Sequence, residues 1–289
     1  DYAVYHKANI KPERMEDAAH YSPSPVLFGR HGRIVKCGAC GLVYMNPRPD
    51  TGSILKKYGE VPHAEYAGQE KQRARSAARV LDAVGAAAGW EKLKNLSLLD
   101  VGASTGILMN EAKKRGWRVS GVDVSKWAVD YALKNYALKI IPGTLRQAGF
   151  RKNFFDAVVM CNVIEHLADP SRELEEAARV TKKNGILFIT TPDINSAVSK
   201  IMGGRWYSLL QQHLYYFSPR TLSKMLIEHG FEVVRIKPHA RYYTFGYIAD
   251  RLAAYAPPAR KMLGLLPFKG APVKLNLFDE MEVTARKKI

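Results

Sequence analysis

Two glycines four residues apart, Gly102 and Gly106, directly follow a short apolar run at residues 96–101. A glycine-bearing turn between a strand and a helix lets a ligand approach the backbone at the helix N-terminus, so this segment predicts a nucleotide-binding corner. The third glycine of the dinucleotide pattern G-x-G-x-x-G is lacking, and Asp100 stands just before the turn. A carboxylate there repels a pyrophosphate but can order groups around a cationic amino-acid ligand. The alternative is a tight strand-to-helix turn that binds nothing.

Polar residues also follow the ends of the next apolar runs. Asp123 closes the run at residues 118–122, where an acid can accept both hydrogen bonds from a ribose diol; the alternative is a helix-capping acid ahead of Ser125. Thr144 follows the third run, where a loop would face adenine, and the fourth run, residues 155–161, leads into a polar loop. Because ligands of open α/β sheets bind beyond the carboxyl ends of the strands, these segments predict one shared site.

The elements that must position these residues alternate regularly from residue 69 onward. The strands read as continuous apolar runs, which indicates a parallel sheet covered by helices on both faces, an α/β fold. Residues 1–68 show no long periodic segment, so we expect a small N-terminal module at 1–68 and a large domain at 69–289 with insertions at about 192–218 and 237–273. The expected strands are 96–101, 118–122, 139–141, 155–161, 186–190, 231–236 and about 276–285, and the expected helices are 69–90, 106–115, 125–135, 169–182 and 219–229.

As an ordered set, these segments resemble the class I S-adenosylmethionine-dependent methyltransferases, especially the ubiquinone-biosynthesis O-methyltransferases. The resemblance covers about residues 70–236 and implies a Rossmann-like fold whose seven-stranded mixed sheet ends in an antiparallel strand. Ser104 departs from the family, which usually has a glycine there, but a small hydroxyl residue should still fit. The matching segments are LLDVGASTG at 98–106, GVD at 121–123, GTL at 143–145, FDAVVMCNVIEHLADP at 155–170, KKNGILFITTP at 182–192 and HLYYFSPRTLSKMLIEHGF at 213–231.

The resemblance also implies which residues surround S-adenosylmethionine. Those at its methionine part and ammonium group would be Asp100, Gly102, Ala103, Ser104 and Gly106. Those that hold the ribose, flank the adenine and close the pocket would be Asp123, Val124, Thr144, Leu145, Asn162 and Val163.

Two histidines are candidate catalytic residues for such a transfer. Methyl transfer is an in-line displacement at a carbon that the cofactor already activates, so the protein mainly aligns the reactants, and a hydroxyl acceptor gains from a base such as histidine. His166 follows the fourth strand, and His213 lies in the aromatic insertion. The alternatives are a backbone-bonded loop residue for His166 and a structural anchor for His213. The aromatic residues that form either a substrate lid or plain packing are Trp206, Tyr207, Tyr215, Tyr216 and Phe217.

Cys37 and Cys40, followed by Gly41, look like half of a zinc module that precedes the methyltransferase core in many bacterial sugar- and natural-product-modifying enzymes. Such a turn aims both thiolates at one metal, but tetrahedral zinc needs four ligands. We expect the other pair to lie upstream of Asp1. The alternative is two free thiols. Substitute ligands within this chain would be the histidines His6, His20 and His31.

The composition narrows the class of partner and compartment. The 289 residues hold 44 Lys and Arg against 27 Asp and Glu, a net charge of +17 that attracts nucleic acid, anionic lipid or acidic small molecules. The basic residues are scattered and no RNA-binding module is recognisable, so we expect a small-molecule acceptor, anionic or lipid-linked, rather than nucleic acid. No apolar run approaches the ~20 residues of a membrane span, and no apolar leader is present, which predicts a cytoplasmic protein.

The tail insertion suggests a second surface. Residues 242–268 combine aromatic and aliphatic side chains with Arg251, Arg260 and Lys261, which predicts an amphipathic hairpin over the acceptor site or on an anionic membrane. The alternatives are a helical cap buried on the core or at a homodimer interface.

The leading interpretation is a methyltransferase that acts on a small molecule, by O-methylation of a glycan, quinone or natural product. The high charge favours RNA methylation as an alternative. A NAD-dependent oxidoreductase is disfavoured by the missing third glycine, and a non-catalytic binding protein by the intact turn and Asp123.

Overall fold

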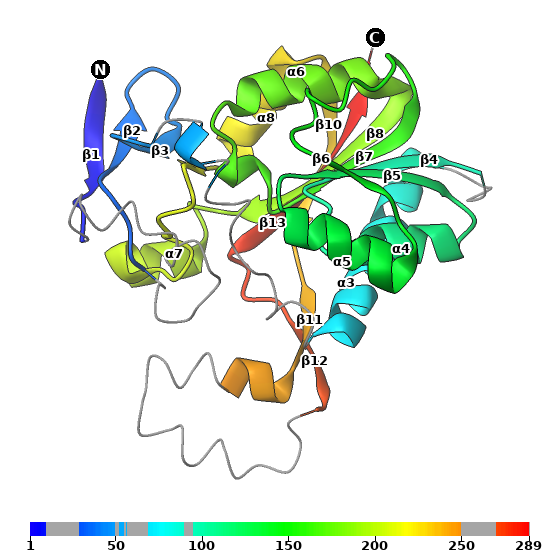
Figure 1. The fold of residues 1–289 in the computed structure, drawn as a ribbon. Helices are drawn as coiled ribbons and strands as arrows, with labels where there is room; N and C mark the ends of the chain where they lie inside the picture. The colour runs from blue at the N-terminus through cyan, green and yellow to red at the C-terminus, as the bar shows by residue number, and fades with distance from the viewer. Residues whose placement is uncertain are drawn as a thin grey trace.

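A seven-stranded sheet dominates the computed structural model, which describes residues 1–9, 29–49, 52–54, 56, 69–89, 95–249 and 270–288 (Figure 1). The strand order is β10-β13-β8-β7-β4-β5-β6. The bounds are β4 Ser97–Val101, β5 Arg118–Asp123, β6 Ile140–Pro142, β7 Phe155–Cys161, β8 Thr181–Pro192, β10 Phe231–Pro238 and β13 Glu280–Lys287.

The directions of these strands confirm the predicted mixed sheet. Neighbouring pairs from β8 through β7, β4 and β5 to β6 are parallel, whereas β13 lies antiparallel to both β8 and β10. The carboxyl ends of β4, β5, β6 and β7 therefore meet at one edge of the sheet, which is the edge that carries the predicted cofactor residues.

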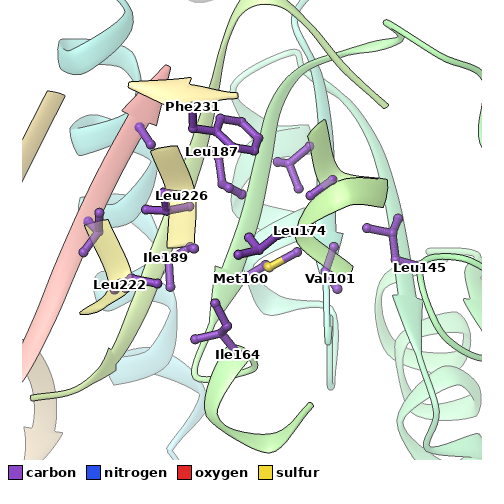
Figure 2. Packing of buried hydrophobic residues seen from close by; sticks show 14 of the residues in the cluster. Val101, Leu145, Met160, Ile164, Leu174, Leu187, Ile189, Leu222, Leu226 and Phe231 are labelled. Carbon is purple, nitrogen blue, oxygen red and sulfur yellow. The ribbon is translucent and has the colours of Figure 1, made fainter. Parts of the chain in front are cut away.

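Helices cover both faces of this sheet because successive strand residues point to opposite sides. On one face, Leu98 packs with Val80 and Leu81 of helix α3. On the other face, Leu99 belongs to a second cluster of buried apolar side chains. Figure 2 shows part of that second cluster, in which Leu174 and Leu226 reach the sheet from two further helices. The helices that bound the sheet are α3 Glu70–Ala88, α4 Ile107–Lys114, α5 Lys126–Tyr136, α6 Pro170–Val180 and α8 Pro219–Glu228.

Polar caps set where three of these helices begin. The Ser125 hydroxyl accepts from the backbone N–H of Ala128 at 3.3 Å, and the Asp169 carboxylate accepts from that of Arg172 at 3.1 Å. Ser218 and Thr221 form a reciprocal capping box at α8. Such caps satisfy N–H groups that the first helical turn leaves without a backbone partner.

A second, four-stranded sheet joins the N-terminal segment to the first insertion, with the order β1-β2-β3-β9. The sheet and the first insertion share a small apolar core that includes Ile34, Trp206 and Tyr216. The strands, together with the short helix of the insertion, are β1 Tyr2–His6, β2 Ile34–Cys37, β3 Val43–Met45, α7 Ala197–Met202 and β9 Tyr215–Tyr216. The sheet thus crosses the predicted domain boundary at residue 68, and the division into 1–68 and 69–289 stays a prediction.

Some element bounds differ from the prediction. The last strand begins at Glu280 rather than at about residue 276, because the Asn276 side chain accepts from the N–H of Phe278, whose φ is +58°. That turn interrupts an extended backbone. Strand β8 starts at Thr181, five residues before the expected start at 186, because its first residue pairs with Phe155 across an irregularity in the ladder.

The tail insertion is described only at its base. Strands β11 (Arg241–Thr244) and β12 (Pro272–Leu275) form an antiparallel pair there. Most of the predicted amphipathic hairpin, residues 250–269, lies outside the described residues. Its contact with a membrane and its place at a homodimer interface therefore stay predictions. Among the helices that the structure describes, none has the length and apolar character needed to cross a bilayer.

Candidate active site

The glycine turn lies between β4 and α4, and the neighbouring strand fixes its backbone. The N–H groups of Gly102 and Ala103 both donate to the carbonyl oxygen of Val122, at 2.9 and 3.0 Å. Gly102 and Gly106 have φ values of +69° and +77°, a region that glycine adopts without steric cost. Ser104 also has a positive φ, +48°, and its buried hydroxyl has no hydrogen-bond partner among the described residues.

Val163 closes directly onto this turn. A Cβ added at Gly102 would lie 2.5 Å from Cγ2 of Val163, so only glycine leaves room for the loop after β7. The structure therefore brings together two predicted site segments that are far apart in the sequence.

Two carboxylates stand at the ends of β4 and β5. Asp123 accepts hydrogen bonds from the backbone N–H groups of Ser104 at 2.7 Å and Ser125 at 2.8 Å, so it orders both the turn and the start of α5. Asp100 is buried. Burial, together with the nearby Asp123 charge, raises the pKa of Asp100 to about 8, and Arg73 opposes the shift. A carboxyl group in this setting favours a cationic neighbour.

The remaining predicted cofactor residues take different positions. Val124 is half-buried between Asp123 and Ser125, and the Thr144 backbone N–H donates to Oε1 of Gln147 at 2.9 Å. Leu145 is 1% exposed and belongs to the apolar cluster that contains Val101 (Figure 2), so packing accounts for most of its surface.

Asn162 holds the end of β7 in a left-handed conformation with φ of +54°. Its side-chain oxygen accepts from the Thr190 hydroxyl at 2.8 Å and from the guanidinium of Arg241, which also pairs with Glu280. Arg241 comes from the base of the tail insertion, so three distant segments converge on this strand end.

The two predicted catalytic histidines meet next to this loop. The rings of His166 and His213 lie edge to face with centroids 4.6 Å apart. Since a carbonyl oxygen only accepts, each Nδ1 carries a proton: that of His166 donates to Gln212 at 3.0 Å and that of His213 donates to Ser208 at 2.8 Å. Burial lowers the pKa of His166 to about 4 and that of His213 well below its ordinary value. Both rings are therefore neutral near pH 7.

Sequence reasoning missed Glu165, Arg241 and Glu280 at this site. Glu165 is 1% exposed, and burial raises the pKa of its carboxyl group to about 8. Its position beside His166 after a core strand was a usable signal. No local signal pointed to Arg241 or Glu280. Arg241 lies in β11, which pairs with β12 outside the main sheet, and Glu280 begins β13, which lies between β8 and β10.

The aromatic insertion is mainly packing. Trp206, Tyr216 and Phe217 are at most 2% exposed, and Tyr215 is also buried. Tyr207 is half-buried and donates its hydroxyl hydrogen to Asp279. For most of these residues the structure favours the packing alternative over a lid.

The cysteine pair lies at the turn between β2 and β3. Backbone N–H groups of Cys40 and Ala39 hydrogen-bond to the Cys37 sulfur and lower its pKa, which favours a thiolate. In the part of the chain that the structure describes, no third histidine, cysteine or carboxylate completes a ligand set with Cys37 and Cys40. His20 lies outside the described residues. Zinc binding at this turn stays a prediction.

Comparison with known families gives one match over this region. The model of a family described as a methyltransferase domain matches residues 69–236, which includes the glycine turn, the strand ends and both histidines.

Curated proteins with similar sequences include ubiquinone biosynthesis O-methyltransferases. That of Pelagibacter ubique is 33% identical over 124 residues, covering 39% of this chain and 50% of that protein. That of Nitrosomonas europaea is 26% identical over 174 residues, covering 52% of this chain and 72% of that protein. The chain thus spans about half the length of the first of these relatives.

Solved structures share the fold at low identity. The cyclase SpnF aligns with a TM-score of 0.52 at 20% identity, covering 73% of this chain and 81% of SpnF. An S-adenosylmethionine-dependent methyltransferase from Thermotoga maritima aligns with a TM-score of 0.50 at 19% identity, covering 76% of this chain and 91% of that one. At these identities the likeness establishes the fold and not the reaction.

Proposed function

The chain belongs to the methyltransferase-domain family of S-adenosylmethionine-dependent enzymes, and from that premise we propose that it transfers a methyl group to an oxygen atom of a small molecule. When bound, S-adenosylmethionine supplies a methyl group on a positively charged sulfur. The protein must then bind and orient the cofactor and the acceptor, and remove a proton from the acceptor.

The residues at the turn fit this cofactor. Asp100 is a buried carboxyl group whose pKa is raised to about 8, so a bound ammonium or sulfonium cation would offset the cost of its charged form. The buried Ser104 hydroxyl has no partner among the described residues and can hydrogen-bond to a ligand. We assign Gly102, Ala103 and Gly106 to the backbone that such a ligand approaches.

Asp123 is our candidate for the ribose. Its two carboxylate oxygens accept from the backbone N–H groups of Ser104 and Ser125, and a carboxylate oxygen can accept more than one hydrogen bond. Val124, Thr144 and Leu145 are assigned to the adenine side, and Asn162 and Val163 to the wall between cofactor and acceptor.

The neutral histidine pair is the observation that carries the reaction class. A hydroxyl acceptor loses a proton when its oxygen is methylated, and an unprotonated imidazole can accept it. The low pKa of His166 keeps the ring in its neutral form, and its protonated Nδ1 leaves Nε2 as the nitrogen with a lone pair. His213 has the same arrangement. We therefore propose either ring as the base.

The acceptor class is proposed from the relatives. The similar curated proteins are named as ubiquinone biosynthesis O-methyltransferases, which supports a phenolic quinone precursor as the first acceptor to test. Glycans and natural products with free hydroxyl groups are the next class. A peripheral membrane contact, a cytoplasmic location and a homodimer belong to the same proposal and rest on the sequence alone.

Transfer of a radiolabelled methyl group from S-adenosylmethionine to a panel of catechol, sugar and RNA acceptors tests this proposal. We expect label in a hydroxyl-bearing small molecule, and we expect Asp123→Ala to abolish it while the matched surface variant Asp130→Ala retains it. Cofactor binding without transfer to any small molecule would contradict the proposed reaction.

RNA methylation is the second candidate, because the net charge of +17 suits a polyanionic substrate. Label that enters only the RNA in the same panel, with a steep loss of transfer as salt increases, would favour this candidate over the first.

A further inference from the structure

The segment that carries His213 lies against the four-stranded sheet of the N-terminal segment. Strand β9, which begins two residues after His213, pairs with β3. Arg48 follows β3 by three residues, and its guanidinium reaches Tyr215 in β9. We propose that Arg48 and Tyr215 position the loop after β7, residues 162–169, for methyl transfer. Their effect on the reaction rests on the proposed function, whereas their contacts with the loop do not.

Tyr215 is the side chain through which the N-terminal segment reaches this loop. Its hydroxyl accepts a hydrogen bond from the guanidinium of Arg48 and donates one to the carbonyl oxygen of Ala168 at 3.3 Å. Because a guanidinium only donates and a carbonyl oxygen only accepts, one hydroxyl serves both partners at once. The Arg48 Cζ atom also lies 5.0 Å from the centre of the Tyr215 ring, within the range of cation–π attraction.

Two backbone hydrogen bonds continue the same connection toward the histidines. The Met45 N–H donates to the carbonyl oxygen of Leu214 at 2.9 Å, and the Leu214 N–H donates to the carbonyl oxygen of Glu165 at 2.8 Å. Leu214 directly follows His213, and Glu165 directly precedes His166. The N-terminal sheet therefore holds both histidines through one residue, and a shift of that residue would move the two rings together.

The loop after β7 is thus held at both ends. Near its start, Val163 fills the space beside Gly102 in the cofactor turn, and near its end Ala168 bonds to Tyr215. His166 lies between these two contacts. Release of the Ala168 end should displace His166 while Val163 still holds the loop to the turn. Since a misplacement of about 1 Å can lower a rate by a factor of about 100, the expected effect falls on turnover and not on cofactor affinity.

The hydroxyl of Tyr215 can be separated from the packing of its ring. The ring belongs to the main apolar cluster and stacks with that of Phe217 at a centroid distance of 6.1 Å. A phenylalanine would keep this packing and lose both hydrogen bonds. Arg48 is exposed, so it adds little to the buried core. Tyr215→Phe and Arg48→Met therefore test the positioning contact and leave the core in place.

Hydrogen–deuterium exchange on the full chain, without cofactor or acceptor, tests the contact apart from any activity. We expect Tyr215→Phe and Arg48→Met to speed exchange in peptides that span residues 162–169 by a factor of roughly 5, as the loss of one hydrogen bond predicts. Exchange in peptides that span 97–106 should stay at the parent rate. Arg48→Lys keeps a cationic donor and should bring the exchange back toward the parent rate.

Steady-state transfer by the same proteins tests the effect on the reaction. We expect Tyr215→Phe to lower kcat by a factor of roughly 10–100, with an S-adenosylmethionine affinity within a few-fold of the parent value. The double variant Arg48→Met/Tyr215→Phe should lose little more than Tyr215→Phe, because Arg48 acts through the hydroxyl that is already gone. A role in general stability alone would make the two losses add and would not single out kcat.

Arg33→Met is the matched control, since Arg33 is also exposed and its Nε donates to the carbonyl oxygen of Asn46 at 2.8 Å, within the N-terminal segment. Far-ultraviolet circular dichroism shows whether each variant is folded. The proposal is overturned if folded Tyr215→Phe exchanges residues 162–169 at the parent rate, or if Arg33→Met speeds that exchange as much as Arg48→Met. Faster exchange with an unchanged kcat would overturn it as well. A parent protein that transfers no methyl group would refute the proposed function, while the exchange rates would still decide whether Arg48 and Tyr215 hold the loop.

Discussion

Val163 occupies the space that a side chain at Gly102 would need: a Cβ on Gly102 would lie 2.5 Å from Val163 Cγ2. The contact joins the turn after β4 to the loop after β7. The contact between the Val163 methyl group and Gly102 thus fixes the relative position of the two loops that surround the predicted cofactor site.

Gly102→Ala should weaken S-adenosylmethionine binding by at least about tenfold, or ~1.4 kcal/mol, because the new methyl group displaces Val163. Calorimetry gives the affinity. Gly116→Ala is the matched control, since Gly116 has a φ of +79° but nothing within 4 Å of its added Cβ. The double variant Gly102→Ala/Val163→Ala should recover part of the affinity. If it recovers none, then backbone strain rather than the contact explains the loss.

The two histidines should separate turnover from cofactor binding. His166→Ala or His213→Ala should lower kcat by a factor of roughly 10²–10⁴ if the ring acts in proton transfer, while the affinity for S-adenosylmethionine stays within a few-fold of the parent value. Steady-state kinetics and calorimetry on the same preparations check this. A histidine whose loss leaves kcat unchanged has only the structural role that its backbone hydrogen bond provides.

Asp100 should couple cofactor binding to proton release. Its pKa is raised from 3.8 to about 8, so the free protein holds this proton at pH 7, and a cationic ligand favours the carboxylate. The affinity should therefore rise as the pH increases from about 6 toward 8. Calorimetry at pH 7 in buffers with different ionisation enthalpies should reveal protons released on binding. Asp100→Asn should remove its share of that release, and equal release by the variant would contradict the assignment.

The same shift predicts how stability changes with pH. Between pH 3.8 and about 8 the folded state holds a proton on Asp100 that the unfolded chain has lost. The free energy of unfolding should therefore fall as the pH rises through that window. Urea titrations at several pH values should show a shallower fall for Asp100→Asn than for the parent. Equal slopes would mean that Asp100 is already ionised in the free protein.

The sequence predicted the large sheet well because its strands are long apolar runs flanked by helical periods and caps. The small sheet was missed: β3 has three residues and β9 has two, too few for a period, and their pairing joins a segment before the predicted large domain to one inside it. The predicted site residues lie at strand ends that a parallel topology brings together. Arg241 could not be placed because it reaches Asn162 from a strand outside the main sheet. The residue pattern around Arg241 does not indicate a contact so distant in the sequence.

Arg241 and Glu280 should stabilise the fold only as a pair. Burial alone would raise the pKa of Glu280, but the charges of Arg241 and His239 outweigh it and keep that pKa below its ordinary value. Arg241→Met removes a partner that is 31% exposed and leaves a carboxylate that is 17% exposed, so we expect a loss of about 1–3 kcal/mol in the free energy of unfolding. Glu280→Gln in the Arg241→Met background should restore part of this, because no charge is then left buried. Urea titrations of the two single variants and the double variant give the coupling energy. Strictly additive losses would show that the pair does not interact, and that the tail insertion is held to the site by its backbone contacts instead.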